Sequence, residues 1–271
     1  MKKNKKTGKN AFDEYYESIF VDRWKSLRES LFLEKKYYSF CCENKATYFL
    51  DPASVLAASV LPLDHRKKIL DMCAAPGGKT LILASRMESD SVLFSNERSA
   101  DRRNRLVSVV KDSLPESIAE RVQILAQDGS LMCKNKNNFF DAILLDAPCS
   151  SEQHVITSEK HLDQWTEARI KNLSFTQWSL LSSAFLMLEE GGYLVYSTCA
   201  LAPAENDGVV KKLLKKYKEA KTLDIDFSTL NNSLLEKFNL IPENTSYGYQ
   251  ILPDINEGAG PIYFSLIRKE F

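Results

Sequence analysis

The sequence lacks the patterns that define several large classes of protein. No run approaches the ~18 consecutive apolar residues of a membrane-spanning helix, and the lysine-rich start is not followed by the apolar segment of a secretory signal. None of the six cysteines forms a Cys-X-X-Cys pair, which argues against a zinc ribbon or a thioredoxin-type motif. There is no internal repeat and no linker rich in proline, glycine or serine. These absences favour a reduced, intracellular protein with one main domain and no membrane partner.

An excess of charge of either sign is also missing, because 36 basic and 36 acidic residues give a formal net charge of zero. The basic residues are nevertheless clustered: five lysines lie in residues 1–10, four arginines in 98–105 and six lysines in 211–221. Such clusters neutralise phosphates locally, although solvated helix faces and a disordered tail give the same pattern. The start also lacks the Arg- and Ser-rich pattern of a mitochondrial presequence. A bacterial cytoplasm is therefore the predicted location, with a mitochondrion as the alternative.

Three regions follow one another along the chain. Residues 1–10 are predicted to be a disordered basic tail, residues 11–62 an N-terminal helical extension, and residues 63–271 a Rossmann-like domain. Within the extension, apolar residues at helical spacing predict a helix over 11–36. Asp51-Pro52 then offers an N-cap and a first-position proline for a second helix.

In the main domain, strand-like runs alternate with helical runs. The expected strands are 68–71, 91–96, 122–126, 142–146, 192–197, 250–252 and 262–268, and the expected helices are 79–87, 99–112, 169–189 and 204–219. Alternation of this kind predicts an α/β fold with a mostly parallel, seven-stranded sheet. The last two strands are expected to form an antiparallel hairpin at one edge. This arrangement is closer to a class I methyltransferase sheet than to a symmetrical dinucleotide-binding fold.

A turn of small residues after the first strand of this domain is the predicted cofactor loop. Its residues are Cys73, Ala74, Ala75, Pro76, Gly77, Gly78, Lys79 and Thr80. A Walker A motif needs glycine where Cys73 stands, and GxGxxG is absent, so neither a P-loop nor a dinucleotide fingerprint is present. Small residues let a ligand approach the backbone, and free N–H groups at a helix start bind a carboxylate, such as that of S-adenosylmethionine.

Acidic residues at the ends of the next two strands complete the predicted cofactor site. Glu97 is placed to accept hydrogen bonds from ribose hydroxyls, and Asp128-Gly129 to reach the adenine amino group. We also assign Arg102, from the arginine cluster, and Asp146 to this site. Taken singly, each acid is equally explained as a helix cap or a surface carboxylate.

Two cysteines each close a hydrophobic, strand-like run. Cys149 follows the strand that ends near Asp146, and Cys199 follows the strand over 192–197. Because ligands bind beyond the carboxyl ends of the strands in an open α/β sheet, both thiols are expected in one crevice. A cofactor loop with paired thiols indicates covalent catalysis on a bound substrate. Spacing alone does not say which thiol attacks.

Three motifs in this order resemble the signatures of the Nol/Nop/Sun family of S-adenosylmethionine-dependent RNA cytosine-5 methyltransferases. They are residues 71–80 (DMCAAPGGKT), 146–149 (DAPC) and 197–199 (STC), and the resemblance covers about residues 45–271. It implies the class I methyltransferase fold, with Cys199 as the nucleophile that attacks C6 of cytosine and Cys149 as the group that assists product release. DNA cytosine methyltransferases instead attack with the Pro-Cys thiol, so these roles rest on the resemblance. Asp146 is expected to hydrogen-bond N3 and the exocyclic amine of the base.

Residues 24–31 and 260–264 resemble the branch that contains the mitochondrial small-subunit ribosomal RNA methyltransferase. The resemblance implies ribosomal RNA as the substrate, with transfer RNA as the alternative. A ribosome-assembly factor whose catalysis is dispensable stays open as a different class. Members of that branch have no appended RNA-binding domain, which implies either a minimal substrate surface or an accessory RNA-binding protein. We expect the protein itself to be a monomer.

Departures from the family pattern follow both thiols. Ser150-Ser151-Glu152 stands where many relatives have Ser-Gly, and Ala200 where many have serine, which bears on specificity more than on the chemistry. The segment 151–168, with Trp165, either covers the crevice and stacks on RNA or is an ordinary loop with Trp165 as its packing anchor. Lys79 either contacts the bound ligands or caps the helix turn. A zinc site from Cys149 and the two nearby histidines lacks a fourth ligand, so no metal is predicted.

Overall fold

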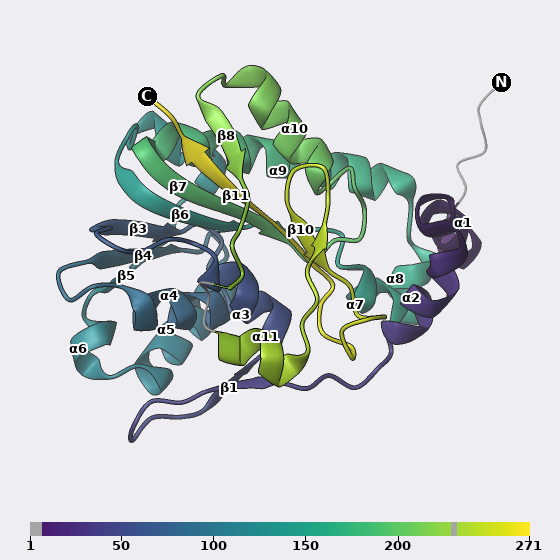
Figure 1. Cartoon of the computed structure of the whole chain (residues 1–271), viewed down its shortest axis with the longest axis horizontal. Coiled ribbons are helices and arrows are strands. Elements are labelled where there is room, and N and C mark those ends of the chain that lie inside the picture. The colour runs from purple at the N-terminus through teal and green to yellow at the C-terminus, as the bar shows by residue number, and fades with distance from the viewer. Residues whose placement is uncertain (1–6, 229–231) are drawn as a thin grey trace.

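The computed structural model describes residues 7–228 and 232–271, and at its centre lies a sheet of nine strands (Figure 1). Five parallel strands form one half, in the order β5-β4-β3-β6-β7. They are β3 (Lys68–Asp71), β4 (Val92–Asn96), β5 (Val122–Leu125), β6 (Phe140–Asp146) and β7 (Leu188–Thr198). The expected mostly parallel α/β fold is confirmed.

Four antiparallel strands form the other half. They are β8 (Ala220–Leu223), β9 (Glu243–Asn244), β10 (Tyr249–Ile251) and β11 (Ile262–Lys269). β11 pairs with β7 along one side, and β10 and β11 form the predicted antiparallel hairpin. The predicted number of strands was too low, because β8 and β9 were missed. β11 is long enough to pair with β10 at its start and with β8 at its end, so one edge holds two short strands.

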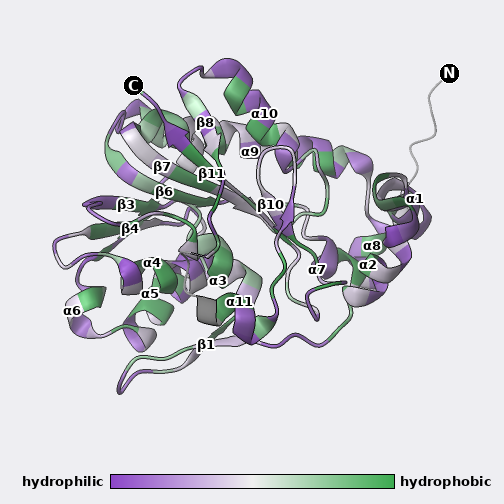
Figure 2. Ribbon diagram, in the orientation of Figure 1, coloured by the Kyte–Doolittle hydropathy of each residue, from purple (hydrophilic) through white to green (hydrophobic). Residues whose placement is uncertain are grey.

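Helices cover both faces of the sheet (Figure 1). One face carries α3 (Pro52–Ser59), α4 (Gly78–Arg86), α5 (Ala100–Ser113), α6 (Glu116–Ala119) and α11 (Asn232–Phe238), and the other carries α9 (Glu167–Met187) and α10 (Asp207–Lys216). Successive residues of β6 alternate between the two cores: Leu144 packs with the first group and Leu145 with the second. Both are fully buried. This double burial explains the apolar stretches in the middle of the central strands, which are green in Figure 2, whereas the ends of the strands carry polar residues.

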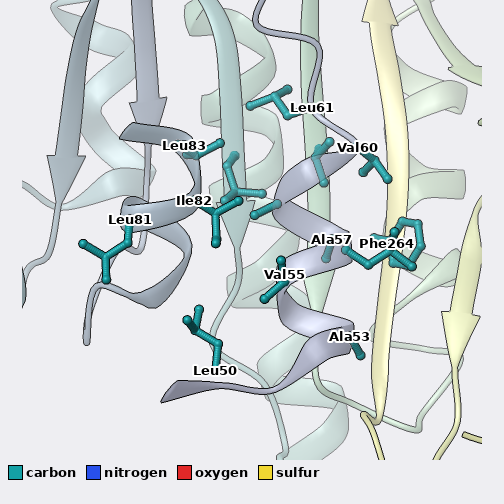
Figure 3. Close-up of a cluster of buried hydrophobic side chains, with 14 of the residues drawn as sticks. Leu50, Ala53, Val55, Ala57, Val60, Leu61, Leu81, Ile82, Leu83 and Phe264 are labelled. Atoms are coloured by element: carbon teal, nitrogen blue, oxygen red, sulfur yellow. The ribbon is translucent and has the colours of Figure 1, made fainter. Parts of the chain in front are cut away.

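The core between α3, α4 and β11 supports the cofactor loop from below. Figure 3 shows Val55 and Ala57 of α3 lying between Ile82 of α4 and Phe264 of β11. Burying a side chain the size of Val, Ile or Phe contributes about 1.5–3 kcal/mol. The start of α3 agrees with the predicted cap, because the Asp51 side chain accepts a hydrogen bond from the amide of Ala53 at 2.9 Å.

The N-terminal region folds over the main domain as two helices rather than one. α1 (Gly8–Phe20) is followed by a 3₁₀ turn, η1 (Val21–Arg23), and by α2 (Trp24–Ser30). The predicted tail over 1–10 is wrong for residues 8–10, which are helical; residues 1–6 lie outside the described part of the chain. The amide of Gly8 donates to the carbonyl of Trp165 at 3.0 Å, so a distant segment anchors this helix start.

The predicted continuous helix over 11–36 breaks at Val21, whose φ is 49°. The break lets α1 and α2 fold together, because the rings of Tyr16 and Trp24 stack with centroids 5.2 Å apart. Phe12 joins them and makes a T-shaped contact with Trp165, with ring centroids 5.6 Å apart. Packing of this aromatic cluster therefore overrides the helical periodicity of the local sequence.

The rest of the expected helical extension contains a small hairpin, which corrects that prediction. β1 (Tyr38–Phe40) and β2 (Tyr48–Leu50) pair antiparallel. β2 packs so closely on α4 that a Cβ on Gly78 would lie 2.7 Å from Leu50 Cδ2. This contact between distant segments fixes strands that are too short to show in a sequence pattern. Within residues 7–228 and 232–271, no helix combines the length and apolar character needed to cross a membrane.

Candidate active site

The two predicted thiols lie side by side. β6 and β7 are parallel neighbours in which Asp146 pairs with Ser197, so the residues that follow them leave the sheet together. Cys149 Sγ and Cys199 Sγ are 3.0 Å apart, and both cysteines are free. Ser151 Oγ lies 3.3 Å from Cys199 Sγ and 3.5 Å from Cys149 Sγ. The strand order thus brings together groups that are 50 positions apart in the sequence.

The environment separates the acidity of the two thiols. The hydrogen bond from Cys149 lowers the pKa of Cys199, and burial opposes this shift while the Ser151 hydroxyl adds to it. The same contact, followed by burial, raises the pKa of Cys149 well above its ordinary range. Cys199 is exposed whereas Cys149 is half-buried. Cys199 is therefore the thiol that is more readily ionised and more accessible, which is what a nucleophile requires.

Asp146 lies beside the thiols at the end of β6. Its carboxylate accepts hydrogen bonds from Lys79 Nζ at 2.8 Å and from Ser197 Oγ at 2.9 Å. Burial alone lowers the pKa of Lys79, but the Asp146 carboxylate outweighs it and leaves the pKa above its usual value. Lys79 also lies 3.4 Å from Ser54 Oγ of α3. Lys79 therefore pairs with Asp146 rather than capping its helix turn.

The cofactor loop closes onto α4 as the small residues predict. Gly77 is the N-cap with φ +119°, and a Cβ there would lie 2.9 Å from Val109 Cγ1. Below the loop, Thr80 Oγ1 donates to Asp71 Oδ2 at 2.7 Å. Burial raises the pKa of Asp71 to about 7, and that of the neighbouring Cys73 rises strongly for the same reason. The turn is thus fixed from beneath, and Cys73 at its start lines a cavity.

Glu97 and Arg102 flank this cavity, as predicted. Glu97 is buried, and its Oε2 lies 3.3 Å from Arg102 Nη1. The second guanidinium nitrogen of Arg102 donates to the carbonyl of Ala75 at 2.6 Å. Arg102 therefore connects the cofactor loop to the acid at the end of β4.

Asp128 and Gly129 also line this cavity, at the start of the 3₁₀ helix η2 (Gly129–Lys134). The Ser130 hydroxyl lowers the pKa of Asp128, and Arg98, 3.0 Å away, adds to the shift. A Cβ on Gly129 would lie 2.9 Å from Met72 Cε, so glycine lets the wall approach closely. Arg98 is a site residue that sequence reasoning did not assign.

The cavity between these walls fits the expected cofactor. Its volume is about 340 Å³. It is lined by the strand-end acids Glu97, Asp128 and Asp146, and by both thiols. Carboxylates of this kind accept hydrogen bonds from ribose hydroxyls and an adenine amine, and they favour a nearby sulfonium cation. The residues of this lining therefore suit S-adenosylmethionine.

A second cavity, of about 190 Å³, adjoins the first and shares Cys73 and Asp146 with it. Its other wall comes from β2 and the start of α3, including Tyr48, Phe49 and Ser54. The hairpin that the sequence did not predict therefore forms part of the site.

Two buried carboxyl groups, those of Glu152 and Glu205, support the loops that follow β6 and β7 and carry the two thiols. These carboxyl groups were not assigned to the site from the sequence. Ser150 Oγ contacts both Glu152 Oε1 and Glu205 Oε1. Glu205 also accepts hydrogen bonds from the amide of Ser150 at 3.0 Å and from Gln177 Nε2 at 2.7 Å. Glu152 accepts hydrogen bonds from the amide of Leu201 at 2.8 Å, just after Cys199, and from Tyr16 Oη at 2.5 Å. The departure from the family pattern at Glu152 was the available signal.

The segment after the first thiol forms two short helices, α7 (Glu152–Ile156) and α8 (Glu159–Asp163). Trp165 is only 2% exposed and packs with Tyr15 and Phe12 of α1. The packing-anchor interpretation of Trp165 is therefore correct, and the ring is not free to stack on RNA. Among the described residues, no three His, Cys, Asp or Glu side chains are grouped closely enough to hold a metal ion.

Residues 58–264 match the family model described as "16S rRNA methyltransferase RsmB/F". The chain belongs to this family. This match confirms the resemblance to Nol/Nop/Sun methyltransferases, because the curated relatives of the chain include proteins named as RNA cytosine-5 methyltransferases.

Curated relatives are about one-third identical to this chain. The mitochondrial tRNA (cytosine(34)-C(5))-methyltransferase of Danio rerio is 30% identical over 83% of this chain and 61% of its own length. The 5-cytosine rRNA methyltransferase NSUN4 of Mus musculus is 31% identical over 82% and 60%. The ribosomal RNA small subunit methyltransferase F of Aeromonas salmonicida is 36% identical over 82% and 45%. The chain thus spans about three-fifths or less of the length of these three relatives.

Solved structures agree in fold. NSun6 from Pyrococcus horikoshii with the S-adenosylmethionine analogue SFG has a TM-score of 0.68 at 24% identity, covering 84% of this chain and 54% of that one. A methyltransferase homologue from the same organism also has a TM-score of 0.68, at 21% identity, covering 95% and 94%. This RsmB/F family member therefore has the fold of S-adenosylmethionine-dependent methyltransferases.

Proposed function

We propose that this chain is an S-adenosylmethionine-dependent RNA (cytosine-5)-methyltransferase that acts on small-subunit ribosomal RNA. The observation that carries the proposal is the pair of thiols, 3.0 Å apart, which lie with Asp146 in the lining of the cofactor cavity. A hydrolase or an ordinary amine methyltransferase has no need for two thiols at this place. Transfer to C5 of a pyrimidine does, because C5 must first be activated through a covalent bond at C6.

Cys199 is the proposed nucleophile. Its thiolate is favoured by the hydrogen bond from Cys149 and by Ser151. Addition of the thiolate to C6 of cytosine breaks the C5–C6 double bond and makes C5 electron-rich. The base has to leave its stack to reach the thiol, which costs least in a single-stranded loop.

Asp146 is the proposed partner of the polar edge of the base. Its carboxylate is oriented by Lys79 and Ser197 before any substrate binds. As thiolate addition makes N3 of the base more basic, N3 takes up a proton from water, and the N3–H and the exocyclic amine then donate hydrogen bonds to this carboxylate, which stabilises the adduct. Lys79 prevents Asp146 from turning away, so it acts here as a positioning residue.

Cys149 is the proposed helper in product release. After methylation, water takes the proton from C5, the C5–C6 double bond re-forms, and the Cys199 thiolate leaves. Because the pKa of Cys149 is high, this thiol is protonated at the start and its hydrogen bond stabilises the departing Cys199 thiolate. S-adenosylmethionine, when bound, supplies the electrophilic methyl group. We assign its binding to residues 73–80, Glu97, Arg102, Asp128, Gly129 and Asp146.

Single-thiol variants test the chemistry. Cys199→Ala should abolish transfer of a radiolabelled methyl group to RNA, because no covalent adduct forms. Cys149→Ala should accumulate a protein–RNA adduct that migrates slowly on a denaturing gel. Full activity of Cys199→Ala would refute its assignment, and absence of the slow band would refute the role of Cys149.

Bisulfite sequencing of ribosomal and transfer RNA, from cells with and without the gene, tests the substrate. Loss of a small-subunit ribosomal 5-methylcytosine supports the proposal, and the NSUN4 relatives named for rRNA favour this outcome. Loss at a transfer-RNA site supports the alternative, which the Danio rerio and mouse relatives favour. If every 5-methylcytosine is unchanged, the result favours the hypothesis of a ribosome-assembly factor whose catalysis is dispensable.

The relatives' names also bear on partners and location. They support RNA as the binding partner, whereas an accessory protein and a monomeric state stay predictions. Two of the names include the word mitochondrial, which supports the mitochondrial alternative, and the predicted cytoplasmic location has no support from them. Fractionation of cells that express a tagged chain distinguishes the two locations.

A further inference from the structure

Two neighbouring helices present a surface without carboxylates. After its first residue, α9 contains no Asp or Glu, and the same holds for α10. The exposed basic residues of the two helices are Arg169, Lys171, Lys211, Lys212, Lys215 and Lys216. Figure 2 shows α10 with strongly polar bands along its outer side. A surface with these basic residues and no carboxylate is locally positive, although the formal net charge of the chain is zero.

Aromatic rings lie among these lysines. Phe175 of α9 is 55% exposed, and Lys212 Nζ of α10 lies 5.3 Å from its ring centroid. One turn further along both helices, Lys216 Nζ lies 5.4 Å from the ring of Trp178. We call the surface formed by Lys171, Phe175, Trp178, Lys212 and Lys216 the α9–α10 face.

The α9–α10 face begins at the mouth of the thiol cavity. Thr176, next to Phe175 in α9, lines that cavity together with both thiols. Gln177 Nε2 donates to the carbonyl of Pro148 at 3.0 Å, one residue before Cys149. α9 is thus fixed directly to a thiol loop, and the row of lysines and rings leads away from the reaction centre.

The geometry points to the α9–α10 face as the platform for single-stranded RNA that flanks the target base, with Lys212 and Lys216 at phosphates and Phe175 against a base. This inference rests on the proposed function and names the surface through which that function binds its substrate. Lysines beside the exposed ring of Phe175 and the half-buried ring of Trp178 match the two recurring elements of single-strand recognition: backbone neutralisation and base stacking. Lysine is depleted from the buried centres of protein–protein interfaces, so a protein partner fits this face less well.

The first test measures how salt affects binding of a short fluorescein-labelled single-stranded RNA. The variant is Lys212→Gln/Lys216→Gln. Each lost phosphate contact makes the slope of log K against log salt less steep by about 0.7, so the double variant should lose about 1.4. Relative to 1 M salt, this change lowers the affinity at 0.1 M salt by about 25-fold. Lys136→Gln/Lys237→Gln is the matched control, because these lysines also lie over rings, 4.2 Å from Phe139 and 5.5 Å from Phe238, elsewhere on the molecule.

The second test concerns the ring. Phe175→Ala should weaken binding of the same RNA by roughly 5-fold or more, and Phe175→Tyr should restore it, because stacking needs a flat ring and not its particular edge. An unchanged salt slope in the lysine double variant, or equal loss in the control, overturns the inference. Equal binding by Phe175→Ala and the wild type removes the stacking role.

Methyl transfer separates this inference from the proposed function. For the lysine double variant, the KM for RNA should rise with kcat at saturating RNA retained, since neither lysine lies in the cavity. If the wild type methylates RNA but the variant has the same KM and salt slope, the assignment of RNA binding to the α9–α10 face is refuted and the proposed function is retained. If the wild type binds RNA through this face without methylating ribosomal or transfer RNA, the proposed function is refuted and the RNA-binding role of the face is retained.

Discussion

Replacing Glu205 by glutamine should remove a pH dependence of stability that the wild type carries. Ser150 has one hydroxyl hydrogen, yet its oxygen contacts a carboxyl oxygen of Glu152 and one of Glu205. Because an ionised carboxylate only accepts hydrogen bonds, one of these contacts needs a proton on a carboxyl group. Glu205 carries it: burial, and then the charge of Glu152, raise its pKa to about 7.

The magnitude follows from this pKa. Glu205 is fully buried, and its pKa moves from the usual 4.5 to about 7 on folding. Between these values the folded state binds more protons than the unfolded state, so stability falls as the pH rises through this window and stays lower above it. At about 1.4 kcal/mol for each pH unit, Glu205 alone removes about 3 kcal/mol between pH 4.5 and 8.

Glutamine reproduces the protonated form. Its carbonyl oxygen can accept from the Ser150 amide and Gln177, and its NH₂ group can donate to Ser150 Oγ. Glu205→Gln should therefore keep methyl transfer activity, whereas Glu205→Ala should reduce it by leaving buried donors without an acceptor.

Urea unfolding of the wild type and Glu205→Gln at pH 5 and pH 8.5 measures the effect. The difference in unfolding free energy between them should change by about 3 kcal/mol in favour of the variant at the higher pH. Glu159→Gln, at an exposed position of α8, controls for loss of one negative charge. The reasoning fails if the difference for Glu205→Gln is the same at both pH values.

Substitutions at three further positions test contacts that stabilise the fold and the site. Arg23→Ala should cost about 2 kcal/mol in urea unfolding, because it leaves Asp254, whose side chain is 6% exposed, without its charged partner at 2.6 Å. Equal stability would contradict this. Gly77→Ala should cost about 1–3 kcal/mol and weaken binding of S-adenosylhomocysteine by calorimetry, since φ is +119° and the added Cβ meets Val109 at 2.9 Å. Asp51→Ala should lower stability by about 2 kcal/mol and Asp51→Asn by less, because asparagine keeps the helix cap; equal losses would assign the effect to the lysine ion pair instead.

Local patterns were enough for the elements that carry the cofactor. The strand over 68–71 was predicted with its observed bounds, because it is an apolar run that ends in Asp71 before a turn of small residues. The start of α3 followed from Asp51-Pro52 for the same kind of reason: cap chemistry is contained within a few residues. The two thiols were predicted to share a crevice from the topology of parallel strands alone, and they do.

Contacts between distant segments account for what was missed. The Glu152–Ser150–Glu205 group joins residues 53 positions apart, and it forms only because β6 and β7 lie side by side. The hairpin of β1 and β2 is stabilised by packing on α4. No pattern within residues 38–50 predicts this packing. The bend at Val21 likewise depends on Trp165, far along the chain.

The thiol pair also decides how the protein responds to oxidants. Two sulfurs 3.0 Å apart need to approach by only about 1 Å to reach the length of a disulfide bond. An oxidant that removes two electrons and two protons from Cys149 and Cys199 would consume the nucleophile and its helper in one event. The same proximity lets a reductant restore both together, without exposing either sulfur to deeper oxidation. The arrangement that we propose for release of the RNA thus also makes the protein reversibly sensitive to the redox state of its surroundings.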